Sequence, residues 1–263
     1  MENKNTVLFI EPRIHERTTK ILNYYVSVIG KNWNYVFYCG KNTKKYWEKS
    51  DLNKIYELRE LDVVNFNTED LYSDFMKQKK LWESLYGEFV LTMQIDTWIT
   101  NDYGYTIDDF IKLNKSFIGG NMSYHYIETY IREDICFEYD NFNGGLSLRK
   151  RKDMIKIINS FPPQKTSSNP DLINRNIFTD AEDVYFLLGC YKLGLPLGDD
   201  EDSSHFTVHT VFKEKFWGIH KPHKTIEDDL IKHYPKVYYL NPYIDPNYGE
   251  AIICNVVGGS LKF

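Results

Sequence analysis

Short apolar runs alternate with segments of helical periodicity over the first half of this 263-residue chain. Each apolar run is a candidate buried strand, and each periodic segment is a candidate helix that covers the sheet. This alternation predicts an α/β fold with a mixed, mostly parallel sheet flanked by helices. The predicted strands are 6–10, 35–39, 54–58, 89–95 and 116–118, and the predicted helices are 17–29, 68–85 and 106–113.

The second half of the chain is less regular. It contains no Pro-rich or Gly-rich linker that would separate two domains, so we expect a single domain over residues 1–263. Prolines and polar residues predict one loop, and a run of acidic residues predicts a second, mobile one. The predicted strands are 146–149 and 216–220, the predicted helices are 153–160 and 180–193, and the predicted loops are 161–171 and 198–204.

The charge balance limits the classes of partner. The chain carries 32 basic and 37 acidic residues, a net charge of −5. A mildly acidic protein has no global attraction for nucleic acid or anionic membranes, so a phosphate ligand would need a local site. No run reaches the roughly 18 apolar residues of a membrane span, and the apolar run Val7–Ile10 is too short for a signal peptide. We therefore expect a cytoplasmic protein with no membrane span and no nucleic-acid partner.

The four cysteines are not arranged for metal binding or cross-linking. Cys39, Cys136, Cys190 and Cys254 form no CxxC pair. Their spacing suits neither a zinc site nor a small disulfide scaffold. We expect buried free thiols in a reducing compartment.

Polar residues follow several predicted strands. Ligands of open α/β sheets bind outside the carboxyl ends of the strands, which makes these residues candidates for a site. Glu11-Pro12-Arg13 follows the first strand, Gly40 follows the second, and Gln94-Ile95-Asp96 closes the fourth. A carboxylate such as Asp96 can hold a hard divalent cation. It can equally cap the turn after the strand.

Two further segments carry candidate residues. The glycines of Asn143-Gly144-Gly145 permit close approach of a ligand or of another backbone, and they also fit a plain turn. Thr179 and Glu182 have the spacing of a helix capping box, which would explain Glu182 without a function. Asp183 is not explained in this way. An ionised Asp183 in the first helical turn would be favoured by the helix dipole and is a candidate general base.

The C-terminal part adds basic candidates. His220 is a candidate metal ligand and Lys221 a candidate phosphate contact, although a surface histidine fits this pattern as well. His205 and His209 are four residues apart and would share a helix face, but no third zinc ligand accompanies them. Residues 149–152, a run of four basic side chains, are predicted to be a solvated helix start, with phosphate or acceptor binding as the alternative.

The order of these segments is similar to that of nucleotide-sugar-dependent glycosyltransferases with the GT-A fold. A strand-end arginine is followed by QxD, NGG, ED at a helix start and a C-terminal GxHK. More narrowly, the chain resembles an uncharacterised glycosyltransferase-like family whose members carry EPR, FQTD, NGGLSLR, EDVYF and FGIHKPW. The corresponding segments here, between about Val7 and His223, are IEPR, WESLYGEFVLTMQIDTW, NGGLSLR, EDVYF and FWGIHKP.

The resemblance implies a GT-A-like domain and a reaction. About residues 1–120 would form a Rossmann-like, nucleotide-binding half, and about 121–263 an acceptor-binding half. The reaction would move a sugar from a nucleoside-diphosphate sugar, commonly a UDP-sugar, to a hydroxyl of a glycan or protein acceptor. The resemblance further implies dependence on Mn²⁺ or Mg²⁺ and favours inversion at the sugar. If the enzyme retains configuration instead, no base is required and Asp183 would only position groups.

The resemblance also implies roles for individual residues. Asp96 and His220 would be the metal ligands. Asp183 would be the general base, with Glu182 holding the acceptor or capping the helix. The remaining candidates would bind the donor: Glu11, Arg13, Gln94 and Lys221. Asn143, Gly144 and Gly145 would also bind the donor and would line its sugar pocket.

One position departs from the GT-A pattern. Gln94 stands where the DxD motif of these enzymes has its first aspartate, so Asp96 is the sole carboxylate of the motif. This departure favours an alternative function, a catalytically inactive module that binds a nucleotide or glycan. A metal-dependent phosphohydrolase is a third candidate, but two-metal sites need more clustered acids than Asp96 and Asp183 supply.

Overall fold

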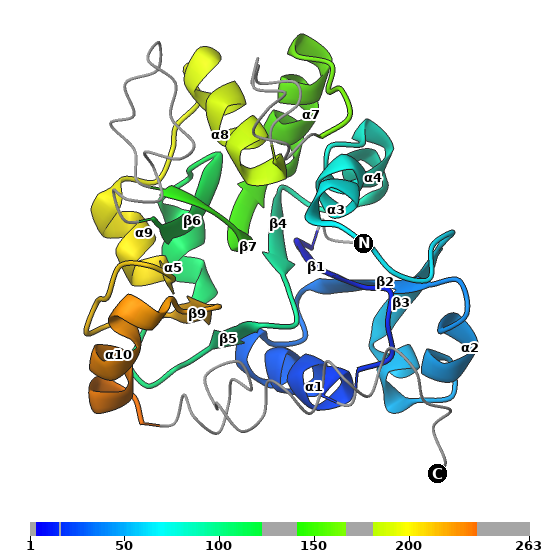
Figure 1. The fold of residues 1–263 in the computed structure, drawn as a ribbon, viewed down its shortest axis with the longest axis horizontal. Coiled ribbons are helices and arrows are strands. Elements are labelled where there is room, and N and C mark those ends of the chain that lie inside the picture. The colour runs from blue at the N-terminus through cyan, green and yellow to red at the C-terminus, as the bar shows by residue number, and fades with distance from the viewer. Residues whose placement is uncertain (1–3, 16, 123–140, 167–180, 236–263) are drawn as a thin grey trace.

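The computed structural model describes residues 4–15, 17–122, 141–166 and 181–235 (Figure 1). Its central six-stranded sheet has the order β3-β2-β1-β4-β7-β6. The first four of these strands run parallel, whereas β7 is antiparallel to both of its neighbours. The strands are β1 (Thr6–Glu11), β2 (Asn34–Gly40), β3 (Tyr56–Leu61), β4 (Phe89–Met93), β6 (Phe117–Asn121) and β7 (Asn141–Lys150).

Helices cover both faces of this sheet. One face packs against α1, α2 and α5, and the other packs against α3, α4, α7 and α8. The α-helices are α1 (Thr18–Ile29), α2 (Lys44–Trp47), α3 (Glu69–Met76), α4 (Lys79–Ser84), α5 (Ile107–Lys112), α7 (Arg151–Ser160), α8 (Glu182–Lys192), α9 (Asp200–Phe206) and α10 (Glu227–His233), and the 3₁₀ helices are η1 (Asp51–Lys54) and η3 (Lys224–Ile226). This arrangement confirms the predicted fold class, a mixed and mostly parallel sheet flanked by helices.

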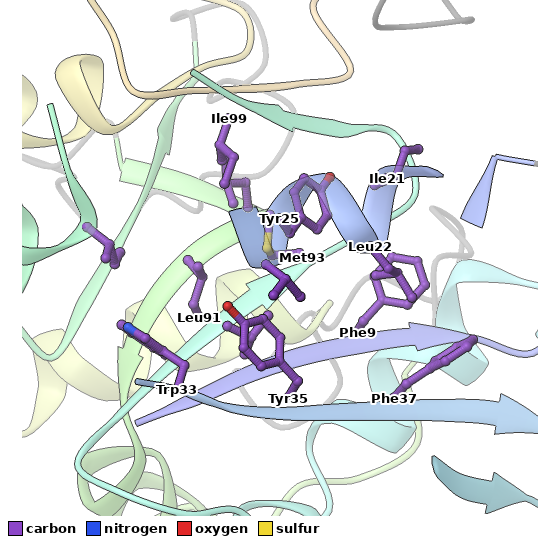
Figure 2. Packing of buried hydrophobic residues seen from close by; sticks show 14 of the residues in the cluster. Phe9, Ile21, Leu22, Tyr25, Trp33, Tyr35, Phe37, Leu91, Met93 and Ile99 are labelled. Carbon is purple, nitrogen blue, oxygen red and sulfur yellow. The ribbon is translucent and has the colours of Figure 1, made fainter. Parts of the chain in front are cut away.

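The central strand β1 shows why its sequence is an unbroken apolar run. Successive side chains of a strand point to opposite faces of the sheet. Val7 and Phe9 therefore enter the core beneath α1, and Leu8 and Ile10 enter the core on the opposite face. Figure 2 shows Phe9 among the side chains packed between α1 and the sheet. A strand buried on both faces has no polar alternation, which is typical of parallel sheets.

A second, smaller sheet lies beside the end of β4. It contains β5 (Thr97–Ile99), β9 (Gly218–His220) and β8 (Thr207–Val208), in the order β5-β9-β8. β5 begins only four residues after β4 ends. β9 pairs antiparallel with β5. The small sheet therefore brings a segment from the C-terminal part of the chain to the carboxyl edge of the central sheet.

The helix predicted over 68–85 is two helices. α3 ends at Met76 and α4 begins at Lys79, with Gln78 in an extended conformation between them. The side chain of Lys77 is buried at this break, and its ammonium group donates to the Gln164 carbonyl and the Thr166 hydroxyl. Phe75 and Trp82, on either side of the break, are seven residues apart, which also fits one continuous helix, so periodicity alone does not reveal the break.

The acidic segment predicted to be a mobile loop is a helix. α9 begins after Asp199, whose carboxylate accepts a hydrogen bond from the Asp202 backbone N–H at 2.8 Å. The Asp202 carboxylate accepts in return from the Asp199 N–H. This reciprocal capping box, together with acidic residues in the first turn, stabilises a helix start.

Two smaller findings concern the remaining expectations. Cys39 and Cys190 are buried free thiols, as predicted, whereas Cys136 and Cys254 lie outside the described residues. Within the described ranges, no helix combines the length and apolar character needed to cross a bilayer.

Candidate active site

Strand pairing brings Asp96 and His220 together. Thr97 of β5 is paired with His220 of β9, and the Lys221 N–H donates to the Asp96 carbonyl at 3.2 Å. As a result, His220 Nε2 lies 3.2 Å from Asp96 Oδ1, although 124 residues separate the two in sequence. The side chains are 7% and 15% exposed, so this carboxylate and imidazole form a mostly buried pair.

The turn that carries Asp96 is closed by other groups. The Thr97 N–H and hydroxyl both donate to the Gln94 carbonyl, at 3.2 and 2.7 Å. Asp96 Oδ1 is buried and makes no well-aligned hydrogen bond within the described part of the chain. Burial would raise the pKa of Asp96, but the nearby His220 and Lys221 outweigh it and lower the pKa. The Asp96 carboxylate is thus ionised, can supply an oxygen ligand, and is not needed to close the turn.

The NGG segment lies against this pair. The Gln94 N–H donates to the Gly145 carbonyl at 3.0 Å, which continues the antiparallel pairing of β4 with β7. A Cβ atom at Gly145 would overlap the imidazole of His220. Gln94 Oε1 also lies 3.2 Å from His220 Nε2. The glycine is therefore required by the close approach of the His220 ring to the β7 backbone.

The neighbouring glycine lies against the ED segment. A Cβ atom at Gly144 would overlap Glu182 Oε1 and would lie 2.7 Å from Arg149 Nη2 and 3.0 Å from Asp183 Cβ. The Gly144 N–H donates to Asp183 Oδ2 at 3.3 Å. Asn143 folds back so that its Oδ1 accepts from the Gly145 N–H at 3.0 Å. The NGG segment is thus the contact between the Asp96–His220 pair and Asp183.

Asp183 has the ionisation expected of a proton acceptor. Desolvation, followed by the charge of the adjacent Glu182 carboxylate, raises the pKa of its carboxyl group to about 7. Hydrogen bonds from the Val184 and Gly144 N–H groups, and the charge of Arg149, act in the opposite direction. A carboxylate with a pKa near neutrality is suited to general base catalysis.

Glu182 is held by Arg149. The Arg149 guanidinium donates to both oxygens of Glu182 and to the Gly144 carbonyl, and the Arg149 side chain is fully buried. The prediction of a solvated helix start at residues 149–152 was therefore wrong for Arg149. Arg149 is in β7, and α7 begins at Arg151, the third residue of the basic run. Alternation along β7 points its side chain into the core.

The capping box predicted from Thr179 and Glu182 would make Glu182 the third residue of the helix. α8 begins at Glu182 itself, with Ala181 as its N-cap residue. Thr179 lies outside the described residues. Glu182 is thus the first helical residue, and its carboxylate is free of the cap and available to Arg149.

Glu11 and Arg13 pair at the carboxyl end of β1. Arg13 Nε and Nη2 donate to the two oxygens of Glu11, each at 2.8 Å. Glu11 is buried, and the Arg13 side chain is 41% exposed. β1 and β4 are adjacent parallel strands, so the pair lies at the same sheet edge as Gln94 and Asp96. None of the described contacts joins Glu11 or Arg13 directly to Asp96 or His220.

Lys221 is exposed and backbone-strained. Its φ of 34° is in the left-handed region, which non-glycine residues seldom occupy. Such strain concentrates at functional sites, where the surrounding structure enforces it. Here it is enforced by the hydrogen bond from the Lys221 N–H to the Asp96 carbonyl.

Three residues lie at this site that the sequence did not assign to it: His209, Tyr72 and Arg149. His209 stacks on His220 with ring centroids 5.2 Å apart, and its Nδ1 lies 2.8 Å from the His220 carbonyl oxygen. It does not share a helix face with His205, because α9 ends at Phe206. Tyr72 places a buried hydroxyl near Gln94, Glu182 and Asp183. No sequence pattern indicates Tyr72. Arg149 is the last residue of the NGGLSLR segment, which is a signal that could have identified it.

Replacing Gly145 by alanine tests the contact with His220. We expect the ring to be displaced, because a Cβ atom at this position overlaps it. The measurement is the pair of His220 ring C–H resonances in NMR spectra. Gly104→Ala is the matched control, since its positive φ strains alanine but no atom of the described residues lies within 4 Å of the added Cβ. Unchanged His220 resonances in a folded Gly145→Ala variant would contradict the described packing.

Comparison with known proteins places the chain in a family. Residues 55–223 match the model of a family described as a protein of unknown function, DUF5672. The chain belongs to the DUF5672 family. The matched region contains Asp96, the NGG segment, Asp183 and His220. The family region therefore includes both parts of the candidate site, but it ends before α10 and begins after β1.

The other comparisons are weaker. No curated protein matches this DUF5672 chain. Among solved structures, the crystal structure of S. aureus TarS 1–349 is similar with a TM-score of 0.47 and 14% sequence identity. That match covers 86% of the present chain and 62% of the TarS chain.

Proposed function

We propose that this DUF5672 protein is a glycosyltransferase that moves a sugar from a nucleoside-diphosphate sugar, a UDP-sugar, to a hydroxyl acceptor with inversion. One observation carries the proposal. The NGG segment joins a buried Asp96–His220 pair to Asp183, whose pKa is raised to about 7. This arrangement supports a site in which Asp96 and His220 would bind a cation and Asp183 would act as the base. The order of motifs, which resembles that of GT-A glycosyltransferases, supports the same function.

The residues at the strand end fit a divalent cation with two protein ligands. Asp96 offers a buried oxygen to which no described residue makes a well-aligned hydrogen bond, and His220 offers an imidazole nitrogen beside it. The described residues contain no group of three or more His, Cys, Asp or Glu side chains that would complete a closed metal site. A mixed carboxylate and imidazole pair suits Mn²⁺, with the donor diphosphate supplying further oxygens. The cation would neutralise charge on the leaving diphosphate.

The remaining residues would bind and orient the two substrates. Lys221 is exposed next to the cation pair and would contact the diphosphate, and Arg13 would lie near the nucleotide. Asn143 and the two glycines would line the sugar pocket. Asp183 Oδ would accept the proton of the acceptor hydroxyl while that oxygen attacks the anomeric carbon. The bond between the anomeric carbon and the diphosphate oxygen breaks, and the nucleoside diphosphate leaves with the bonding electrons.

A donor panel tests the proposal. Nucleotide sugars would be screened with Mn²⁺ for stabilisation against thermal unfolding and for release of nucleoside diphosphate. We expect one donor to stabilise the protein and to be hydrolysed slowly without an acceptor. Stabilisation by a nucleotide with no turnover of any donor would instead support the inactive binding module that Gln94 favours.

Asp96→Ala tests the cation pair separately. We expect the variant to lose Mn²⁺ binding, measured by electron paramagnetic resonance with UDP present, because one of two protein ligands is removed. Donor hydrolysis should fall with it. Asp108→Ala, an exposed aspartate in α5, is the control and should bind Mn²⁺ like the unaltered protein. Unchanged Mn²⁺ binding in folded Asp96→Ala would remove this residue from the cation site.

A further inference from the structure

The buried ion pair of Arg149 and Glu182 lies next to Asp183. The Arg149 guanidinium is enclosed by the rings of Phe117, Phe186 and Trp82, with its central carbon 4.7 to 5.8 Å from their centroids. Its partner Glu182 has a side chain only 5% exposed. A buried ion pair generally stabilises a protein no more than apolar side chains of the same volume. Stability alone therefore does not account for this pair.

The pair connects the two segments that meet at Asp183. Arg149 Nε donates to Ser147 Oγ at 2.8 Å, and Nη2 donates to the Gly144 carbonyl at 3.3 Å. The same guanidinium holds Glu182 at the start of α8. β7 and the N-terminus of α8 are thereby fixed relative to each other. The Gly144 N–H then meets the Asp183 carboxylate in a defined position.

We propose that Arg149 and Glu182 are positioning residues that hold the Asp183 carboxylate against the Gly144 N–H and control its ionisation. The inference rests on the proposed function, since the ionisation of Asp183 matters for a base. The acid–base role of Asp183 is thus divided. Asp183 takes the proton, and the neighbouring buried pair determines the pH above which its carboxylate is ionised and able to take it.

The titratable groups facing Asp183 give the expected direction of each substitution. They are the Glu182 carboxylate, the Arg149 guanidinium and, from α3, the Tyr72 hydroxyl. Glu182 raises the pKa of Asp183 and Arg149 lowers it. Glu182→Gln should therefore lower this pKa, and Arg149→Met should raise it. The double variant R149M/E182L removes both effects, so its Asp183 pKa should lie between those of the two single variants.

The test is a direct titration of Asp183 by carbon NMR of labelled carboxyl groups. Asp183→Asn identifies its resonance. We expect the midpoint in Glu182→Gln to fall by about one pH unit or more, as for loss of an adjacent like charge. The midpoint in R149M/E182L should lie above that of Glu182→Gln. The double variant keeps the test valid if Arg149→Met alone does not fold. Equal midpoints in the folded variants would overturn the inference.

The pH profile of sugar transfer links the pair to catalysis. In Glu182→Gln the acidic limb of kcat/KM should move to lower pH together with the NMR midpoint, while the donor KM changes by no more than about twofold. A merely structural pair would lower activity at all pH values alike. If the NMR midpoints shift but no donor is turned over, the proposed function fails and the control of Asp183 ionisation stands.

Discussion

Asp183→Asn is expected to lower the rate of sugar transfer by about 10²- to 10⁴-fold, the usual contribution of a positioned general base. Asparagine keeps the size of the side chain and can still accept from the Gly144 N–H, but it takes up no proton. Binding of the donor should be unaffected, because Asp96 and His220 are unchanged. The measurement is kcat at saturating donor, together with the thermal shift caused by the donor nucleotide.

The same residue predicts a pH dependence. With a pKa of about 7, Asp183 would act as a base mainly above neutrality. kcat/KM of the unaltered protein should therefore fall about tenfold per pH unit below pH 7 and level off above it. Asp228→Asn in α10 is the control, since it removes an exposed first-turn aspartate away from the site. An acidic limb centred near pH 4 in the unaltered protein would contradict the assignment.

Stability should respond to the same ionisation. The pKa of Asp183 is higher in the folded protein than its ordinary value of 3.8, so the folded state binds this proton more tightly. The free energy of unfolding should therefore decrease as the pH rises from about 4 to about 7. Asp183→Asn cannot lose this proton. Its stability relative to the unaltered protein should increase over that range, as measured by urea unfolding at several pH values.

Arg149→Met is expected to destabilise the fold by about 3 to 5 kcal/mol, the usual result of removing one partner of a buried ion pair. The Glu182 carboxylate would remain buried at the start of α8 without its partner. The Gly144 carbonyl would also lose a donor. The measurement is the free energy of unfolding in urea at pH 8, where carboxylates are ionised.

The double variant separates the cost of an unpaired charge from the value of the pair. R149M/E182L replaces both side chains by apolar ones of similar volume, and its stability should approach that of the unaltered protein. Lys79→Met is the surface control, because Lys79 pairs with Glu83 where both side chains are about half exposed. It should have little effect. A double variant as unstable as Arg149→Met would show that the pair itself stabilises the fold.

Much of the central sheet follows from the sequence. β1, β2 and β4 are unbroken apolar runs because both of their faces are buried, and α1 carries its apolar residues at helical spacing. These patterns depend on local period and composition, which are visible in the chain. The break between α3 and α4 and the helix α9 were missed. At the break, Lys77 is held by Gln164 and Thr166, which are far away in the chain. The start of α9 depends on a local signal, the Asp199 cap, which the run of acidic residues obscured.

The candidate residues were visible in the sequence, but their neighbours were not. Asp96, Gly145 and His220 carried recognisable patterns with equally good local explanations. Only the pairing of β5 with β9, and of β4 with β7, brings them into contact. Arg149 was misassigned to a solvated surface because four consecutive basic residues look alike in sequence. The register of β7 points this one inward.

The sequence by itself determined the fold class and the order of the motifs, because strand and helix periods are local properties. Tertiary structure alone decided which polar groups face each other: Asp96 with His220, Glu182 with Arg149, and Asp183 with Gly144. Contacts between residues that are distant in the chain depend on strand register and on how closely two backbones approach. A one-residue change in strand register would turn the same side chains to the opposite faces of the sheet.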